Sequence, residues 1–228
     1  MTISTTLEIN GIDKMLNMNF EQRVVINTLS EAWQASPLTG VYRKPLAREE
    51  AEQGHATSIV RYEAGAKFRK HEHPHGEEIL VLEGVFSDET GDYPAGSYLR
   101  NPQGFSHAPF SKHGCFLLVK LHQFQEGDNN IVRVDTQNTP WQSGMGNLQV
   151  MPLHSFKTES TALVYWPAGE HFQPHVHTGG EEIYVISGEF VDEHGRYGEG
   201  TWIRNPHMSQ HNPFVEKDTV ILVKIGHL

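Results

Sequence analysis

Short apolar runs separated by turn residues recur along most of this 228-residue chain. β-branched and aromatic residues dominate runs such as TSIVRY (57–62), CFLLVKL (115–121) and TALVYW (161–166), and Gly, Asp, Asn and Pro cluster between them. The only helical candidate is the segment around REEAEQG (48–54). Many short strands joined by glycine-containing turns predict an all-β fold: a sandwich, a jelly roll or a barrel.

The pattern is duplicated at an offset of 104 residues, so that LRNP (99–102) aligns with IRNP (203–206). Repeats of this kind indicate that one structural unit occurs twice. We therefore divide the chain into an arm at residues 1–20, a first unit at 21–126 and a second unit at 127–228.

Charge and cysteine content exclude several classes of function. The net charge is −10, from 18 basic and 28 acidic residues, which argues against nucleic acid or an anionic membrane as a partner. A single cysteine, Cys115, excludes an intramolecular disulfide and zinc sites built on CxxC. The N-terminal segment does not resemble a signal peptide, and no apolar run approaches the roughly 20 residues that span a bilayer. The expected location is the cytoplasm.

Two histidine-rich segments in register, HEHPHGEE (71–78) and HVHTGGEE (175–182), indicate metal binding. His71 and His73 are two residues apart, so on a strand both side chains point to the same face. Gly76 permits a tight turn that brings Glu77 to the same space, and a second hairpin ending at His107 supplies a further imidazole. Histidine is common here, with 15 in the chain, and a single HxH would be read as a surface feature. Its exact duplication favours ligands.

The candidate ligands are therefore three imidazoles and one carboxylate in each unit. This set suits Zn, Fe, Mn, Ni or Cu better than Ca or Mg, and we expect two divalent transition-metal ions per chain. The ligand residues are His71, His73, Glu77 and His107 in the first unit and His175, His177, Glu181 and His211 in the second.

We make predictions for three further features: one turn and two pairs of equivalent residues. Pro206-His207-Met208 replaces Pro102-Gln103-Gly104, and loss of the glycine predicts a different turn before His211. Strand alternation turns Glu78 and Glu182 away from the ligands, and we expect both to face solvent. For Arg100 and Arg204, which recur in RNP, a structural ion pair is favoured over anion binding.

These residues carry a family resemblance. Gly65-x5-His71-x-His73-x3-Glu77-x6-Gly84, followed by Gly96-x5-Pro102-x-Gly104-x2-His107, resembles the two motifs of the cupin superfamily, and the second unit repeats both. The resemblance implies a bicupin: two tandem double-stranded β-helix (jelly-roll) barrels, each with one metal. HPHGEEILVLEG, DETGDYPAG and LRNP taken together further resemble the cupin domain of ChrR, an anti-sigma factor that binds extracytoplasmic-function sigma factors.

The resemblance implies a regulatory or sensing module in transcription control, with a sigma factor or another regulatory protein as partner and zinc as the favoured metal. The CxxC-containing zinc domain of ChrR-type anti-sigma factors has no counterpart in this sequence. The alternative is a metal-dependent dioxygenase or lyase acting on a small oxygen-rich molecule, and a third reading is a bicupin whose metals are structural. No catalytic acid or base beyond the ligands stands out, so whether the protein is an enzyme, and whether it forms a homodimer, stays open.

Overall fold

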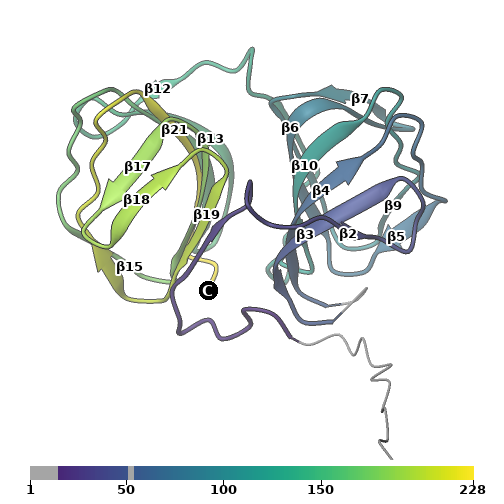
Figure 1. Cartoon of the computed structure of the whole chain (residues 1–228), viewed down its shortest axis with the longest axis horizontal. Coiled ribbons are helices and arrows are strands. Elements are labelled where there is room, and N and C mark those ends of the chain that lie inside the picture. The colour runs from purple at the N-terminus through teal and green to yellow at the C-terminus, as the bar shows by residue number, and fades with distance from the viewer. Residues whose placement is uncertain (1–14, 51–53) are drawn as a thin grey trace, which may run out of the picture.

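The computed structural model describes residues 15–50 and 54–228, which form two β-barrels lying side by side (Figure 1). These residues contain no helix, so the part of the 48–54 helical prediction that they cover is wrong; residues 51–53, like residues 1–14 of the arm, lie outside the described range. Within that range, no helix is long and apolar enough to span a membrane. Cys115 is buried in β10 (Cys115–Leu121).

The first barrel is built on an eight-stranded antiparallel sheet with a small two-stranded sheet at its mouth. The order in the large sheet is β11 (Val132–Asp135), β8 (Ser97–Asn101), β6 (Glu77–Asp88), β10 (Cys115–Leu121), β4 (Ala56–Tyr62), β3 (Val41–Arg48) and β2 (Gln34–Ala35), with β7 (Gly91–Pro94) paired to β6. The small sheet pairs β5 (His71–His73) with β9 (Phe105–His107).

The second barrel repeats this arrangement. Its large sheet has the order β1 (Val24–Asn27), β19 (Thr201–Asn205), β16 (Glu181–Ser187), β21 (Thr219–Ile225), β14 (Glu159–Trp166), β13 (Gln149–Phe156) and β12 (Gln142–Ser143). Two small sheets pair β15 (His175–His177) with β20 (Ser209–His211) and β17 (Glu189–Asp192) with β18 (Gly195–Gly198). The all-β fold of tandem jelly-roll barrels is confirmed.

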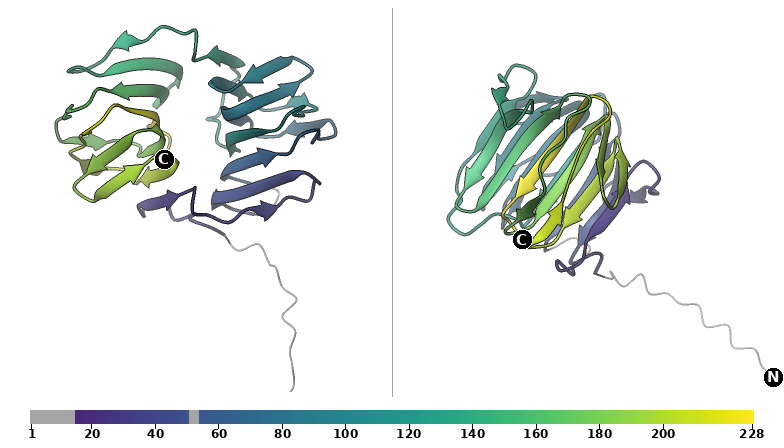
Figure 2. Two further views of the ribbon diagram at one scale, coloured as in Figure 1. Left: turned by 45° about the horizontal axis from the view of Figure 1, so that its top comes forward. Right: turned by 90° about the vertical axis from the view of Figure 1, so that its left-hand side faces the viewer.

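The two units exchange their first strands. β1 precedes the first barrel in the chain, yet it pairs with β19 of the second barrel, with Val24 opposite Arg204. β11 precedes the second barrel and pairs with β8 of the first, with Val132 opposite Arg100. Figure 2 shows the purple β1 strand beside the second barrel. Units 21–126 and 127–228 are thus contiguous in sequence, but each contributes one strand to the other's sheet.

Strand alternation creates a core inside each barrel and a third core between the barrels. On β6, Ile79 and Val81 point into the first barrel, whereas Leu80 points out of it. Leu80 belongs to a cluster that includes Met151 and Leu222 of the second barrel, all of them buried. Full burial of such a side chain contributes about 1.5–3 kcal/mol. The barrels therefore pack through the outer faces of their large sheets.

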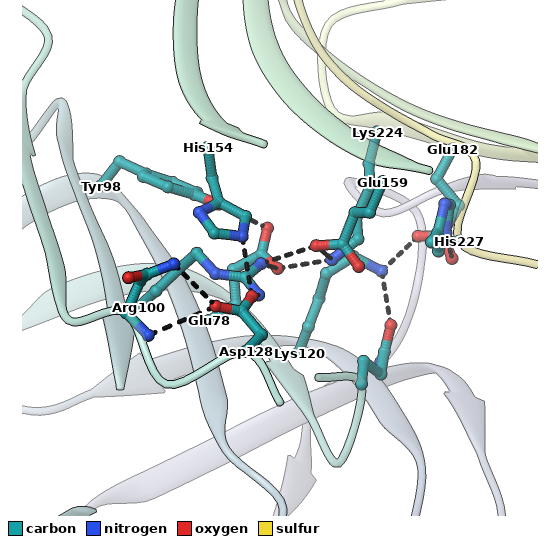
Figure 3. Close-up of polar contacts among 12 residues, drawn as sticks. Glu78, Tyr98, Arg100, Lys120, Asp128, His154, Glu159, Glu182, Lys224 and His227 are labelled. Carbon is teal, nitrogen blue, oxygen red and sulfur yellow. Dashed lines mark hydrogen bonds and ion pairs between the residues drawn. The ribbon is translucent and has the colours of Figure 1, made fainter. Parts of the chain in front are cut away.

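Glu78 lies on the same outward face as Leu80, but the second barrel covers it. Glu78 and Glu182 are each only 3% exposed, so the prediction that both face solvent is wrong. Glu78 accepts hydrogen bonds from Arg100 Nη1 at 2.8 Å and from Lys224 Nζ at 2.7 Å (Figure 3). Glu182 is paired with Lys120 across the same interface. Strand alternation predicts that Glu78 faces away from the candidate ligands, but it does not predict that the second barrel covers that side.

The ion pair expected for Arg100 is confirmed. Besides Glu78, Arg100 pairs with Asp128 at 2.7 Å and with Glu159 at 2.9 Å (Figure 3). Arg204 behaves differently: its guanidinium stacks over the Phe20 ring, 4.7 Å from the ring centroid, and donates to the backbone oxygen of Asn19. No carboxylate among residues 15–50 and 54–228 forms an ion pair with Arg204, so that part of the prediction is not met.

Candidate metal centres

The first centre forms where the small sheet meets the start of β6. Pairing of β5 with β9 places His71 opposite His107, and alternation puts His73 on the same side of β5 as His71. Gly76 adopts φ +79°, a conformation that favours glycine, and the turn at this residue brings Glu77 back to the cluster. His73, Glu77 and His107 are buried, and His71 is half-buried.

Ligand atoms of the first centre lie within reach of one ion. The Nε2 atoms of His73 and His107 are 3.0 Å apart, and Glu77 Oε2 lies 3.5 Å from each of them. The three histidines, including His71, have ligand atoms within 4.8 Å of one another. Two nitrogens bound to one ion at about 2.1 Å lie at most about 4.2 Å apart, which the His73–His107 pair satisfies. The structure thus brings the three predicted histidines together, and Glu77 lies close to His73 and His107 but outside the group that includes His71.

The second centre has the same construction and is the more compact. His175, His177, Glu181 and His211 all have ligand atoms within 4.8 Å of one another. His211 Nε2 lies 3.0 Å from His177 Nε2 and 3.3 Å from His175 Nε2. Glu181 Oε2 lies 3.4 Å from His177 Nε2. All four predicted residues of this unit meet at one point.

Hydrogen bonds at the other ring nitrogen orient the imidazoles. His71 Nδ1 lies 2.9 Å from the Arg69 carbonyl oxygen, and His175 Nδ1 lies 3.0 Å from the carbonyl oxygen of Gln173. A carbonyl oxygen only accepts, so Nδ1 carries the proton and the Nε2 lone pair is left for an ion. The same holds for His107, whose Nδ1 lies 3.1 Å from Asp88 Oδ2.

The ligand carboxylates are held by amides that are themselves held by arginines from the exchanged segments. Asn101 Nδ2 donates to Glu77 Oε2 at 2.9 Å, and Arg133 on β11 donates to Asn101 Oδ1 at 2.6 Å. In the second barrel, Asn205 donates to Glu181 and accepts from the side chain of Arg23. Each ligand carboxylate therefore depends on a residue of the other unit.

Burial sets the protonation of the ligands. Loss of hydration, together with the neighbouring His211 and His175, lowers the pKa of His177 to about 3. Burial also lowers the pKa of His73 and raises the pKa of Glu181. At neutral pH the imidazoles of His73 and His177 are therefore neutral, as metal binding requires. The donor set and its hydrogen bonds fit a transition-metal ion in each barrel.

Sequence reasoning missed the residues that support the ligands. Asp88 and Asp192, and Asn101 and Asn205, repeat at the 104-residue offset just as the ligands do. Their recurrence at that offset was the signal that could have found them. The two centres differ in this support. His107 Nδ1 lies 3.1 Å from Asp88 Oδ2, whereas His211 Nδ1 lies 3.7 Å from Asp192 Oδ2, beyond hydrogen-bond distance.

The expectation of a different turn before His211 is wrong. Met208 has φ +62° and Gly104 has φ +80°, so both occupy the left-handed region. The backbone N–H of Gly104 donates to the His73 carbonyl at 3.0 Å, and that of Met208 donates to the His177 carbonyl at 2.9 Å. The turn is kept in the second unit, with a side chain in a strained backbone conformation.

Each centre opens into a cavity, and the two cavities differ. The first has a volume of about 920 Å³ and is lined by polar groups such as Arg43, His75 and His122 together with His71 and His73. The second has a volume of about 500 Å³, and its lining is mostly apolar. Its lining residues beyond the ligands include Leu148, Val150, Val164, Trp166, Phe172 and Val176. Histidines of both candidate metal centres therefore line cavities, and these cavities differ in size and polarity.

Comparison with solved structures agrees with this architecture. A protein from Nostoc punctiforme, assigned as a candidate dioxygenase, superposes with a TM-score of 0.77 at 14% identity, over 90% of this chain and 82% of that chain. Protein Ylba from E. coli gives a TM-score of 0.69 at 11% identity, over 95% and 94% of the two chains. A deletion mutant of Bacillus subtilis oxalate decarboxylase gives 0.62 at 17% identity, over 95% and 78%. At these identities the likeness shows the fold.

Sequence families give the more specific result. No curated protein sequence matches the chain. The family of ChrR cupin-like domains matches twice, at residues 21–125 and 129–228. The two matches cover nearly the whole of the chain outside its N-terminal segment, and each contains one of the two groups of candidate metal ligands. This chain belongs to the ChrR cupin-like domain family and carries two copies of that domain.

Proposed function

We propose that this protein binds a transition-metal ion in each barrel and that the first centre is a metal-dependent enzymatic site of the oxygenase or lyase class for a small oxygen-rich molecule. The observation that carries the proposal is the 920 Å³ polar cavity lined by His71 and His73. Three imidazoles and one carboxylate leave coordination positions open on a six-coordinate ion, and the cavity leads a substrate to them.

A bound ion would supply Lewis-acid or redox chemistry to oxygen atoms of the substrate. The chain's own residues hold that ion and shape its surroundings. Asp88 keeps the proton of His107 on Nδ1, and Asn101 fixes the Glu77 carboxylate. His75 and His122, whose rings lie 5.1 Å apart, are among the ionisable residues that line the cavity, and a substrate there could exchange protons with them.

The test is a metal-resolved activity screen. The full chain is loaded separately with iron, manganese, nickel and zinc, and is offered diketones, enols and small dicarboxylates, with oxygen uptake and product formation measured. Turnover that depends on one metal and disappears in His71→Ala, but persists in His175→Ala, supports the first centre as the enzymatic site. No turnover with any loaded metal and any of these substrates would contradict the proposal.

A regulatory role is the second candidate, and the family match favours it. The metal ligands Glu77 and Glu181 are each followed directly by a residue of the interface network, Glu78 and Glu182. Metal or ligand binding in one barrel would then alter the packing between barrels, and a protein partner would read that change. Binding to extracytoplasmic-function sigma factors, measured with metal-loaded and metal-free protein, tests this role. If no sigma factor binds to either the metal-loaded or the metal-free protein, this role is excluded.

A further inference from the structure

The cavity of the second barrel combines one group of metal-binding side chains with walls that are otherwise apolar. All four candidate ligands of that barrel line it, whereas only His71 and His73 of the first set line the first cavity. Beyond the ligands, Thr178 and the Trp166 indole are the only side chains with an O–H or N–H group among the described residues that line it. A molecule in this cavity therefore meets the candidate metal ligands and apolar surface.

Three of the apolar side chains that line the second cavity are exposed to solvent. Met145, Val176 and Ile225 are 57%, 43% and 39% exposed, and we call them the apolar rim. Val176 takes the place of Glu72, which lines the first cavity, at the 104-residue offset. Exposed apolar side chains gathered around a hollow are typical of binding sites, because a ligand that covers them removes apolar surface from water.

The apolar lining is a property of the second barrel and not of the duplicated fold. Val164 is equivalent to Val60 at the 104-residue offset, and each lies opposite a residue of the preceding strand. Val150 lies opposite Val164, whereas Arg43 lies opposite Val60. Because Val150 and Arg43 line their respective cavities, the same place on the wall is apolar in the second barrel and polar in the first.

This lining determines the class of ligand. No Lys, Arg or Asp is among the described residues that line the second cavity, and its one carboxylate, Glu181, is a candidate metal ligand. A charged or strongly polar ligand body would lose its hydration there without gaining a partner, which is costly. A donor atom that faces the metal ligands avoids this cost, because a bound ion accepts its electron pair. The volume of about 500 Å³ lies within the range of small-molecule sites.

We propose that the second cavity binds an uncharged, largely apolar small molecule with a single electron-pair donor atom. Its apolar body packs against the walls and the apolar rim, and its donor atom faces the four metal ligands. The inference goes beyond the enzymatic function proposed for the first centre. It rests on the proposed function in one respect, that the second barrel also holds a metal ion.

The test uses two probes with the same metal-binding nitrogen, imidazole and 4-phenylimidazole. The full chain carries His71→Ala, so that the cobalt signal comes from the second centre, and it is loaded with Co²⁺. Each probe is titrated, with calorimetry for affinity and the visible spectrum for contact with the metal. We expect 4-phenylimidazole to bind about 10- to 100-fold more tightly than imidazole, because its additional ring is buried against apolar walls.

One pair of variants gives a matched control. Val164→Thr keeps the shape of a half-buried wall residue but adds a hydroxyl group, and Val60→Thr makes the same change at the equivalent place in the first cavity. Val164→Thr should weaken 4-phenylimidazole binding by about tenfold and leave imidazole within about twofold, whereas Val60→Thr should alter neither. Circular dichroism and cobalt content establish folding and loading. Should Val164→Thr not fold, Val164→Ala should weaken 4-phenylimidazole by about 3- to 10-fold.

The outcomes separate this inference from the metal binding on which it rests. If 4-phenylimidazole has no advantage over imidazole, or if both threonine variants have equal effects, the apolar site is overturned while metal binding by the second barrel stands. If 4-phenylimidazole binds without changing the cobalt spectrum, the contact between donor atom and metal is overturned. A cobalt content near zero in His71→Ala would overturn metal binding by this barrel. A dimer of the chain that sedimentation detects and Val176→Glu abolishes would assign the apolar rim to a protein interface and overturn the proposal.

Discussion

Replacing Asp88 should perturb the first metal centre while every candidate ligand stays in place. Its carboxylate accepts the Nδ1 proton of His107 at 3.1 Å, while its other oxygen accepts from the backbone N–H of Thr90. In Asp88→Asn the Thr90 contacts can be kept by the amide oxygen. The charged acceptor for His107 is lost, and an amide N–H in its place would repel the Nδ1 proton.

The expected magnitude follows from the geometry. Residues that hydrogen-bond to metal-binding histidines typically change metal affinity by 10- to 100-fold when replaced. Burial opposes protonation of His107, yet the bond to Asp88 and the charge of Glu77 outweigh it and raise the pKa of His107. We therefore expect Asp88→Asn to weaken the first centre by about 10- to 100-fold and to release one ion per chain first.

Asp192 is the matched control, because its Oδ2 lies 3.7 Å from His211 Nδ1 and makes no hydrogen bond to it. Asp192→Asn should change metal affinity much less, although losing its 3.0 Å ion pair with Arg23 should lower stability. The assay is competition with a chelator of known affinity, with metal per chain measured by elemental mass spectrometry. Equal losses of affinity in both variants, or none in Asp88→Asn, would refute this account of ligand support.

Three further outcomes can be checked. Met208→Gly should raise the free energy of unfolding by about 0.5–1 kcal/mol. A residue with a side chain loses about 1–2 kcal/mol at a φ of +62°, and part of the gain from glycine is offset because glycine increases the conformational entropy of the unfolded chain. No increase in urea denaturation would contradict this expectation. For Glu78, burial opposes ionisation, but Lys224 and Arg100 outweigh it and lower the pKa from 4.5 to about 2. The resulting stabilisation, about 3 kcal/mol, is therefore present above pH 4.5 and lost as pH falls towards 2; unfolding curves of Glu78→Gln should depend less steeply on pH in this window. A chelator should lower the melting temperature, and His71→Ala should reduce metal content from two ions per chain to one; unchanged content would contradict the first centre.

The clustering of the candidate ligands could be predicted because it depends on local geometry. An HxH on a strand, a glycine turn and a returning glutamate fix three side chains within seven residues, and the duplication supplied the independent support. His107 required only that a second hairpin end beside the first, which the pairing of His71 with His107 fulfils. The all-β class followed from the spacing of short strands and turns, and the resemblance to the cupin motifs implied the jelly roll among the all-β folds.

The sequence could not show whether the outer face of each strand meets solvent or the other barrel. Glu78 alternates away from the ligands as expected, but whether that side meets water or protein depends on a barrel more than a hundred residues away. The same limit concealed Arg133, whose role on Asn101 arises only because β11 crosses to the first barrel. The turn at Met208 could not be predicted for another reason. Its backbone keeps the left-handed conformation and the hydrogen bond to the His177 carbonyl, although the side chain disfavours that conformation.

The exchange of β1 and β11 makes this chain equivalent to a strand-swapped homodimer whose two subunits have been fused. In a homodimer of one such unit, each copy would donate its first strand, and with it the arginine that supports a metal ligand, to the other copy. In this chain the exchange is intramolecular, so the two halves can differ in sequence while each still completes the other. Cutting the gene at the sequence boundary should therefore give two fragments that are unstable alone and recover both metal centres when mixed.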